Sequence, residues 1–153
     1  MAYYINLFSP ETYRAFCDSN RDITGFRDNR RRIAANIKQG DKFICYMTKL
    51  SRWIGVLEVS SDCFIDNQPI FMEADDPFIV RFRVSPKVWL APEEGIPINN
   101  DISWKHLSFT KNLSKTNTAW TGRVRGSLTR LVDEDGRYLE TLLMAQGSER
   151  KSF

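Results

Sequence analysis

The sequence predicts a single α+β domain in which a strongly curved sheet or small β-barrel is flanked by helices. Alternation of apolar and polar residues, typical of strands, fills the middle of the chain, and helical spacing of apolar residues appears near both ends. The 153 residues are 42% hydrophobic and 27% charged, which suits one globular core and not a disordered chain. We expect residues 1–147 to form this domain and residues 148–153 to be a frayed tail.

The N-terminal elements come first along the chain. Residues 3–7 are predicted to form a strand. Ser9 can cap the helix that follows, and Pro10 suits the first position of that helix. A second helix is expected over residues 30–38, with Ile33, Ala34 and Ile37 facing inward.

The central strands follow. Residues 42–48 and 53–59 both alternate and are expected to pair as a hairpin. Residues 78–84 alternate again, which places Arg81 and Arg83 outward, and residues 88–90 are predicted to form a short separate strand. Asp133 is expected to cap a last helix that runs to about Ala145, and Gly147 can end it. The residues expected in the core are Ile44, Val56, Leu57, Val80, Phe82, Leu139 and Leu142.

Charge is distributed unevenly, although the formal net charge is only +3. The segment from Lys111 to Arg130 carries five basic residues and no acid, and Arg30, Arg31 and Arg32 form a second basic cluster. Acids gather elsewhere, at residues 73–76 and 133–135. This asymmetry fits a basic face that meets phosphate groups, and it also fits an ordinary solvated surface. The candidate phosphate contacts are Arg30, Arg31, Arg32, Lys111, Lys115, Arg123 and Arg125.

Several function classes are disfavoured by what the chain contains. The lone histidine, His106, argues against catalytic sites that need a histidine base, and the sequence has no Walker or G-x-G-x-x-G motif. Three widely spaced cysteines suggest reduced thiols and not a metal site. We therefore expect no enzyme activity, no metal and no cofactor. The absence of a signal-peptide pattern and of a long apolar run favours a cytoplasmic protein without a membrane partner.

Four segments, in order, resemble the EVE domains of the PUA-like superfamily, which are related to the YTH readers of modified bases. Residues 25–31 (GFRDNRR) and 38–46 (KQGDKFICY) resemble the family's glycine loop, short helix and G-D-x-v-x-x-Y strand. Residues 53–59 (WIGVLEV), with 64–66 (FID), and residues 78–84 (FIVRFRV) resemble its next two strands. Trp120, Gly126 and residues 131–135 (LVDED) resemble the end of its small standalone members.

The resemblance implies a PUA-like fold and a pocket that takes a base flipped out of its strand. It also implies a nucleic-acid partner, with modified DNA favoured and RNA possible, and in some relatives a nuclease or motor partner of a restriction system. One departure concerns the pocket. The family usually carries Trp directly before the loop glycine, where this chain has Thr24, so Phe26 or Trp53 is expected to supply the missing wall.

A pocket for a flipped base needs flat side chains, because each stacked aromatic contributes about 1–3 kcal/mol. Its edge needs hydrogen-bonding groups to tell one base from another. The candidate pocket residues are Ser9, Thr24, Phe26, Asn29, Tyr46, Thr48, Trp53, Phe71 and Trp120. Core positions remain open for Tyr46 and Trp53, and Phe71 can instead plug its own loop. The function expected is a modified-base reader. An RNA-binding module, a protein-interaction domain and a weak binder of a nucleotide-like metabolite are the alternatives.

Overall fold

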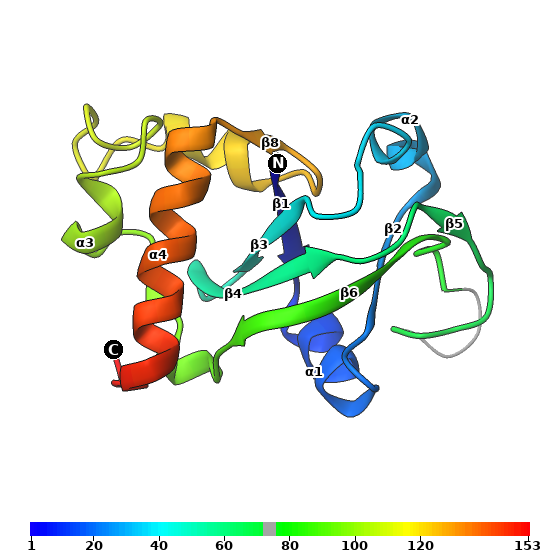
Figure 1. Cartoon of the computed structure of the whole chain (residues 1–153). Helices are drawn as coiled ribbons and strands as arrows, with labels where there is room; N and C mark the ends of the chain where they lie inside the picture. Colours follow the sequence, from blue (N-terminus) through cyan, green and yellow to red (C-terminus); the bar gives the residue numbers. More distant parts are fainter. Residues whose placement is uncertain (72–75) are drawn as a thin grey trace.

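A mixed, strongly curved sheet forms the centre of the computed structural model, which describes residues 1–71 and 76–153 (Figure 1). The strands follow the order β2-β6-β4-β3-β1-β8, with β5 beside β6 and β7 beside β4. β1 runs parallel to β3, and the other pairs are antiparallel. The strands are β1 Tyr3–Phe8, β2 Ile23–Phe26, β3 Lys42–Met47, β4 Arg52–Val59, β5 Phe64–Ile65, β6 Val80–Trp89, β7 Ile96–Pro97 and β8 Arg130–Leu131.

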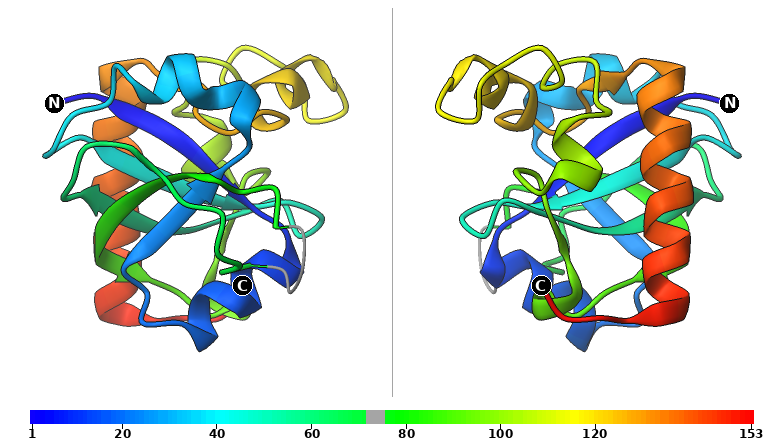
Figure 2. Two further views of the ribbon diagram at one scale, coloured as in Figure 1. Left: turned by 90° about the vertical axis from the view of Figure 1, so that its right-hand side faces the viewer. Right: turned by 90° about the vertical axis from the view of Figure 1, so that its left-hand side faces the viewer.

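Helices flank the sheet on both sides, which confirms the predicted fold class. Figures 1 and 2 show α1 (Pro10–Asp18) and α2 (Arg31–Ala34) on one side, and α3 (Asp101–Trp104) and α4 (Asp133–Glu149) on the other. Three short 3-10 helices lie in the connecting segments: η1 Asp28–Arg30, η2 Pro92–Glu94 and η3 Ala119–Val124. As expected, Ser9 caps α1, because its Oγ accepts from the Thr12 backbone N–H at 3.1 Å.

The second helix is shorter than predicted. It ends at Ala34, and the chain then tightens into i→i+3 turns in which Asn36 and Ile37 donate to the carbonyls of Ile33 and Ala34. The inward residues are unaffected, because Ala34 and Ile37 are buried and Ile33 packs against the same core. The apolar spacing therefore fixed the buried side of this segment but not the length of its helix.

β6 corrects two expectations. It runs without a break from Val80 to Trp89 and passes through Pro86, which pairs with Leu57 where the register with β4 shifts. A proline lacks an N–H and is tolerated at such an irregularity. Arg81, expected to point outward, is only 1% exposed. β2 and β5 flank β6 at this residue, and its guanidinium donates to carbonyl oxygens of the loop that joins β5 to β6.

The curved sheet buries one apolar cluster on each face. Phe16 of α1 and Ala34 of α2 belong to the first cluster, whereas Leu139 of α4 belongs to the second. Of the residues expected in the core, Leu142 is half-buried against the second cluster. The others are buried: Ile44, Val56, Leu57, Val80, Phe82 and Leu139.

Trp53→Ala is expected to lower the free energy of unfolding by about 3–5 kcal/mol. Trp53 is fully buried in the second cluster, and its indole N–H donates to Ser103 Oγ at 3.1 Å. Urea titration of parent and variant measures the loss. Trp120→Ala, which truncates a half-buried tryptophan, is the control and should cost less. A loss below about 1 kcal/mol for Trp53→Ala would contradict the core assignment.

The C-terminal residues contact the rest of the fold. α4 ends at Glu149, four residues beyond the predicted Ala145, and its N-cap is Val132 and not Asp133, which is the first residue of the helix. Beyond it, the Phe153 N–H donates to the Glu93 carbonyl at 3.0 Å, and Gln146 Nε2 donates to the Lys151 carbonyl at 2.7 Å. In the described ranges, no helix has both the length and the apolar character that crossing a bilayer requires. Residues 73–75 of the acidic segment lie outside the described residues.

Candidate functional site

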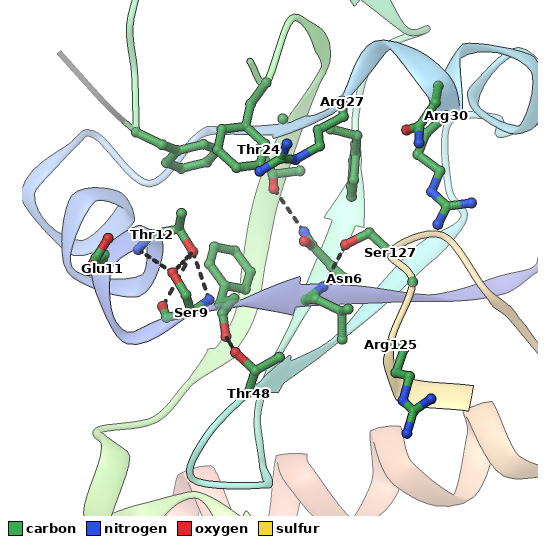
Figure 3. Close-up of a pocket in the computed structure, with 18 residues that line it drawn as sticks. Asn6, Ser9, Glu11, Thr12, Thr24, Arg27, Arg30, Thr48, Arg125 and Ser127 are labelled. Atoms are coloured by element: carbon green, nitrogen blue, oxygen red, sulfur yellow. Dashed lines mark hydrogen bonds between the residues drawn. The ribbon is translucent and has the colours of Figure 1, made fainter. Parts of the chain in front are cut away.

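A cavity of about 420 Å³ opens on the α1 and α2 side of the sheet (Figure 3). It lies where the C-terminal end of β1, the start of α1 and the strand β2 meet. The loop between β5 and β6 and the segment from Arg125 to Ser127 complete its lining. Its volume falls within the range of about 300–1,000 Å³ that is typical of small-ligand pockets.

The apolar wall of the cavity consists of four phenylalanines. Phe8 and Phe26 are buried and belong to the first core cluster, so they form the back of the cavity. Phe71 and Phe78 are half-buried and lie on the loop before β6. The rings of Phe71 and Phe78 are 5.5 Å apart at 84°, and those of Phe8 and Phe71 are 6.4 Å apart at 85°. These edge-to-face contacts are favourable for aromatic pairs and hold the half-buried rings against the core.

Two charged residues hold the loop that carries Phe71 and Phe78. Asp76 accepts hydrogen bonds from the backbone N–H groups of Ile70, Phe71 and Phe78, each at 2.8 Å. From beneath, Arg81 donates through Nε to the Phe78 carbonyl at 3.0 Å and through Nη2 to the Gln68 carbonyl. Asp76 and Arg81 are 6% and 1% exposed, so these charge-assisted bonds are shielded from water. These bonds anchor the backbone at Phe71 and Phe78, the two residues that carry the half-buried rings.

Gly25 of β2 allows this loop to approach closely. A Cβ at this position would lie 2.8 Å from the Phe78 carbonyl oxygen and 3.4 Å from Cε2 of Phe71. A contact under 3.0 Å with a backbone atom forces a shift of the chain, so any side chain here would push the loop outward. The glycine of the 25–31 segment therefore has a steric role in shaping the cavity.

A hydrogen-bonded pair, Asn6 and Thr24, forms the polar floor of the cavity. Asn6 Nδ2 donates to Thr24 Oγ1 at 2.8 Å, and Figure 3 shows the Asn6 side chain reaching from β1 toward Thr24 on β2. Both residues are 1% exposed. Burial of polar groups at this depth is tolerated because they are hydrogen-bonded.

Asn6 was not among the residues predicted from the sequence, although a signal for it exists. Tyr4 and Phe8, two residues to either side in the same strand, both belong to the first core cluster. Strand alternation therefore places Asn6 on that apolar face. A single polar residue between two buried aromatics is costly unless it has a partner, so its presence points to a buried polar contact or a binding site.

Three arginines form the rim of the cavity: Arg27, Arg30 and Arg125. The Arg27 guanidinium lies 5.4 Å from the centre of the Phe78 ring. Arg30 lies against Gly126, where a Cβ would come within 2.6 Å of its Nη2, so a larger residue at this position would displace the guanidinium. Arg125 Nη2 donates to Thr121 Oγ1 at 3.1 Å.

No carboxylate among residues 1–71 and 76–153 forms an ion pair with any of these three arginines. Within the described lining, Glu11 of α1 is the one acidic side chain. The mouth of the cavity therefore carries an excess of positive charge that the carboxylates of residues 1–71 and 76–153 do not neutralise by direct ion pairs. Such an arrangement attracts anions, phosphate groups among them.

The structure brings six of the nine predicted pocket residues together around the cavity: Ser9, Thr24, Phe26, Asn29, Thr48 and Phe71. The hydroxyl of Ser9 is occupied in capping α1, and that of Thr48 donates to the Phe8 carbonyl at 3.3 Å. Asn29 is exposed at the mouth. Thr24 is the predicted edge-reading residue that reaches the interior of the cavity, through its contact with Asn6.

The other three predicted pocket residues do not line the cavity. Tyr46 and Trp53 pack on each other at 4.9 Å in the second cluster, on the opposite face of the sheet, and burial raises the pKa of the Tyr46 phenol. Trp120, on η3, packs edge-to-face on Trp104 at 5.8 Å. Of the two residues expected to replace the tryptophan that is missing at Thr24, Phe26 lines the cavity and Trp53 does not.

The predicted phosphate contacts are spread over a wider surface. Arg30 and Arg125 line the cavity, and Arg32, Lys111 and Arg123 are exposed outside the lining. Arg31 is paired with Asp28 at 2.6 Å, and Lys115 with Asp101 at 2.5 Å. Arg27, which was not singled out from the sequence, completes the rim. In the part of the chain that the structure describes, no cluster of three or more His, Cys, Asp or Glu side chains could hold a metal ion.

Solved structures show which fold this is. The Mmi1 YTH domain in complex with RNA superposes with a TM-score of 0.64 and 17% identity, over 99% of this chain and 82% of that one. Human THYN1 in complex with DNA containing 5-methylcytosine superposes with a TM-score of 0.58 and 14% identity, over 93% of this chain and 97% of that one. The fold is that of the YTH and PUA-like domains.

The similarity extends to bacterial proteins and is structural in kind. Atu2648 from Agrobacterium tumefaciens shares the YTH-like fold with a TM-score of 0.57 and 16% identity, over 93% of this chain and 92% of that one. No protein-family profile and no curated protein sequence matches the chain. At this level of identity, the arrangement of strands and helices is what the proteins have in common, and function has to be argued from the cavity itself.

Proposed function

We propose that this protein is a non-catalytic nucleic-acid-binding module that holds one flipped-out base in the cavity. The observation that carries the proposal is the arginine rim, free of carboxylate partners in the described residues, at the mouth of an aromatic-walled cavity. Guanidinium groups bind phosphate through charge-assisted hydrogen bonds, and aromatic rings replace the stacking that a flipped base loses. In the proposed complex the base lies inside the cavity and the backbone of the strand passes the arginines at the rim.

The energetics of flipping fit this wall. Extruding a base costs a few kcal/mol, and each aromatic that stacks on it returns about 1–3 kcal/mol. Phe71 and Phe78 are the half-buried rings of the wall, and they stand at 84° to each other. A base can therefore stack on one of them and meet the edge of the other. Phosphate contacts at the rim add the rest of the affinity.

A modified base in DNA is the ligand that we favour. Support comes from THYN1, solved with DNA that contains 5-methylcytosine, and from the apolar wall, where a buried methyl group contributes about 0.8 kcal/mol. The RNA complex of Mmi1 supports RNA as the alternative. The resemblance to EVE domains extends the proposal to a cytoplasmic protein that acts beside a nuclease or motor protein in a restriction system.

A binding screen tests the proposal. Oligonucleotides of one sequence, as DNA and as RNA, carry cytosine, 5-methylcytosine, 5-hydroxymethylcytosine, adenine or N6-methyladenine at a single position. We expect a modified DNA strand to bind about fourfold or more tightly than its unmodified counterpart, since one buried methyl group is worth about 0.8 kcal/mol. Fluorescence anisotropy gives the affinities. Tighter binding of the RNA series would assign the module to RNA, and no binding to any strand would refute it.

A further inference from the structure

The polar floor leaves hydrogen-bonding capacity directed into the cavity. Asn6 uses Nδ2 to donate to Thr24 Oγ1, and its Oδ1 has no protein donor within residues 1–71 and 76–153. The residue is 1% exposed and lines the cavity. Among the described residues, Gln146 Oε1 is the one buried side-chain atom that has neither a hydrogen-bond partner nor contact with solvent. Oδ1 of Asn6 has no protein donor either, so it must be in contact with solvent, and the cavity that Asn6 lines provides that contact.

Thr24 contributes the opposite polarity. Its Oγ1 accepts from Asn6, and the hydroxyl proton makes no hydrogen bond to the described protein. A threonine hydroxyl has one proton to donate, and that proton rotates to suit its acceptor. The pair therefore presents an acceptor, Oδ1 of Asn6, beside a donor, the Thr24 hydroxyl, at the bottom of a cavity whose sides are aromatic.

We infer, on the basis of the proposed function, that the Asn6–Thr24 pair selects bases that carry an exocyclic amino group beside an unprotonated ring nitrogen. Cytosine- and adenine-type bases have this edge: the amino group donates to Oδ1 of Asn6, and the ring nitrogen accepts from Thr24. Thymine, uracil and hypoxanthine offer a carbonyl oxygen and a ring N–H in the same places. Their carbonyl would face Oδ1 of Asn6, acceptor against acceptor, with both groups desolvated.

The partner of Asn6 sets the direction of this preference. The bond to Thr24 fixes the amide with its nitrogen toward β2 and its oxygen toward the cavity. A reversed amide would present N–H groups to the ligand and favour the keto bases instead. Thr24 thus acts as a positioning residue for Asn6 as well as a donor, and removing its hydroxyl frees the amide to adopt either orientation.

Two comparisons between bases of matched shape isolate this preference. Single-stranded oligonucleotides of one sequence carry 5-methylcytosine or thymine, and adenine or hypoxanthine, at one position. Within each pair the rings have the same shape, and the amino or keto edge is what differs. We expect the amino base to bind about tenfold or more tightly, since a good two-point base contact discriminates by about 1–3 kcal/mol. The free nucleosides, titrated in parallel, should show the same order at lower affinity because they lack the flanking phosphates.

Three variants assign the preference to the pair. Thr24→Val keeps the shape and should remove most of the amino-over-keto ratio, whereas Thr24→Ser keeps the hydroxyl and should retain it. Thr110→Val is the matched control, because Thr110 is a fully buried threonine whose hydroxyl donates to the Trp104 carbonyl outside the cavity. Thermal melts accompany each titration.

The outcomes separate this inference from the function on which it rests. Equal binding of all four strands, or a preference for the keto bases, would overturn the role of the pair and leave the module a nucleic-acid binder. An amino-over-keto ratio that survives in folded Thr24→Val would overturn it as well. Failure of the parent to bind any of the four strands, when the full screen also shows no binding, would refute the proposed function itself.

Discussion

Phe71→Ala is expected to weaken the binding of every oligonucleotide that places a base in the cavity by about 5- to 150-fold, with the domain still folded. Phe71 is half-buried and meets Phe8 and Phe78 edge-on at 6.4 and 5.5 Å, so its ring forms the outer part of the cavity wall. Its backbone is held independently, by the hydrogen bond from its N–H to Asp76. Truncation therefore removes a stacking surface and leaves the loop attached.

The control for Phe71→Ala is Phe64→Ala. Phe64 is also half-buried, but it lies on β5 and does not line the cavity. The Arg83 guanidinium lies 5.9 Å from the centre of its ring. The Phe64→Ala variant should therefore bind oligonucleotides with the affinity of the parent. Phe26→Ala is a poor test, since Phe26 is 2% exposed and packs on Phe43 and Phe82, so its loss damages the core. A folded Phe71→Ala protein with parental affinity would show that no base stacks on this wall.

Strand positions followed from the sequence because alternation is a local property. The segments 42–48 and 53–59 became the β3–β4 hairpin. In β6, Val80 and Phe82 are buried as alternation predicted, but Arg81 is buried as well. Arg81 is buried although alternation places it outward, and the reason lies in residues distant in the sequence. A loop closes over it, and the carbonyl groups of that loop satisfy its guanidinium, which no local periodicity can indicate.

The candidate site was predictable where neighbours in sequence are neighbours in space. Thr24, Phe26 and Asn29 come from one short segment, and all three line the cavity. Tyr46 and Trp53 could not be placed in the same way. Alternation shows that Tyr46 shares a face with Ile44, but not that α4, almost a hundred residues later, covers that face. Asn6 was missed because its role depends on Thr24, which reaches it from another strand.

Raising the salt concentration from about 50 to about 200 mM is expected to weaken oligonucleotide binding about tenfold or more. The rim carries three guanidinium groups that form no ion pairs with the described carboxylates, and Arg32, Lys111 and Arg123 extend the basic surface beyond it. Each phosphate that the protein neutralises releases counterions, so the logarithm of the affinity falls linearly with the logarithm of the salt concentration.

Neutralising two rim residues together, Arg30→Gln with Arg125→Gln, should reduce the slope of that line by about two. Modified and unmodified strands should lose affinity equally, because phosphate contacts carry no base identity. Arg137→Gln removes one arginine charge from the exposed surface of α4, on the opposite side of the sheet, and should leave the slope unchanged. If the rim variant keeps the parental slope, the backbone of the ligand does not cross the mouth of the cavity, and the path of the strand has to be sought along the other basic residues of the 111–130 segment.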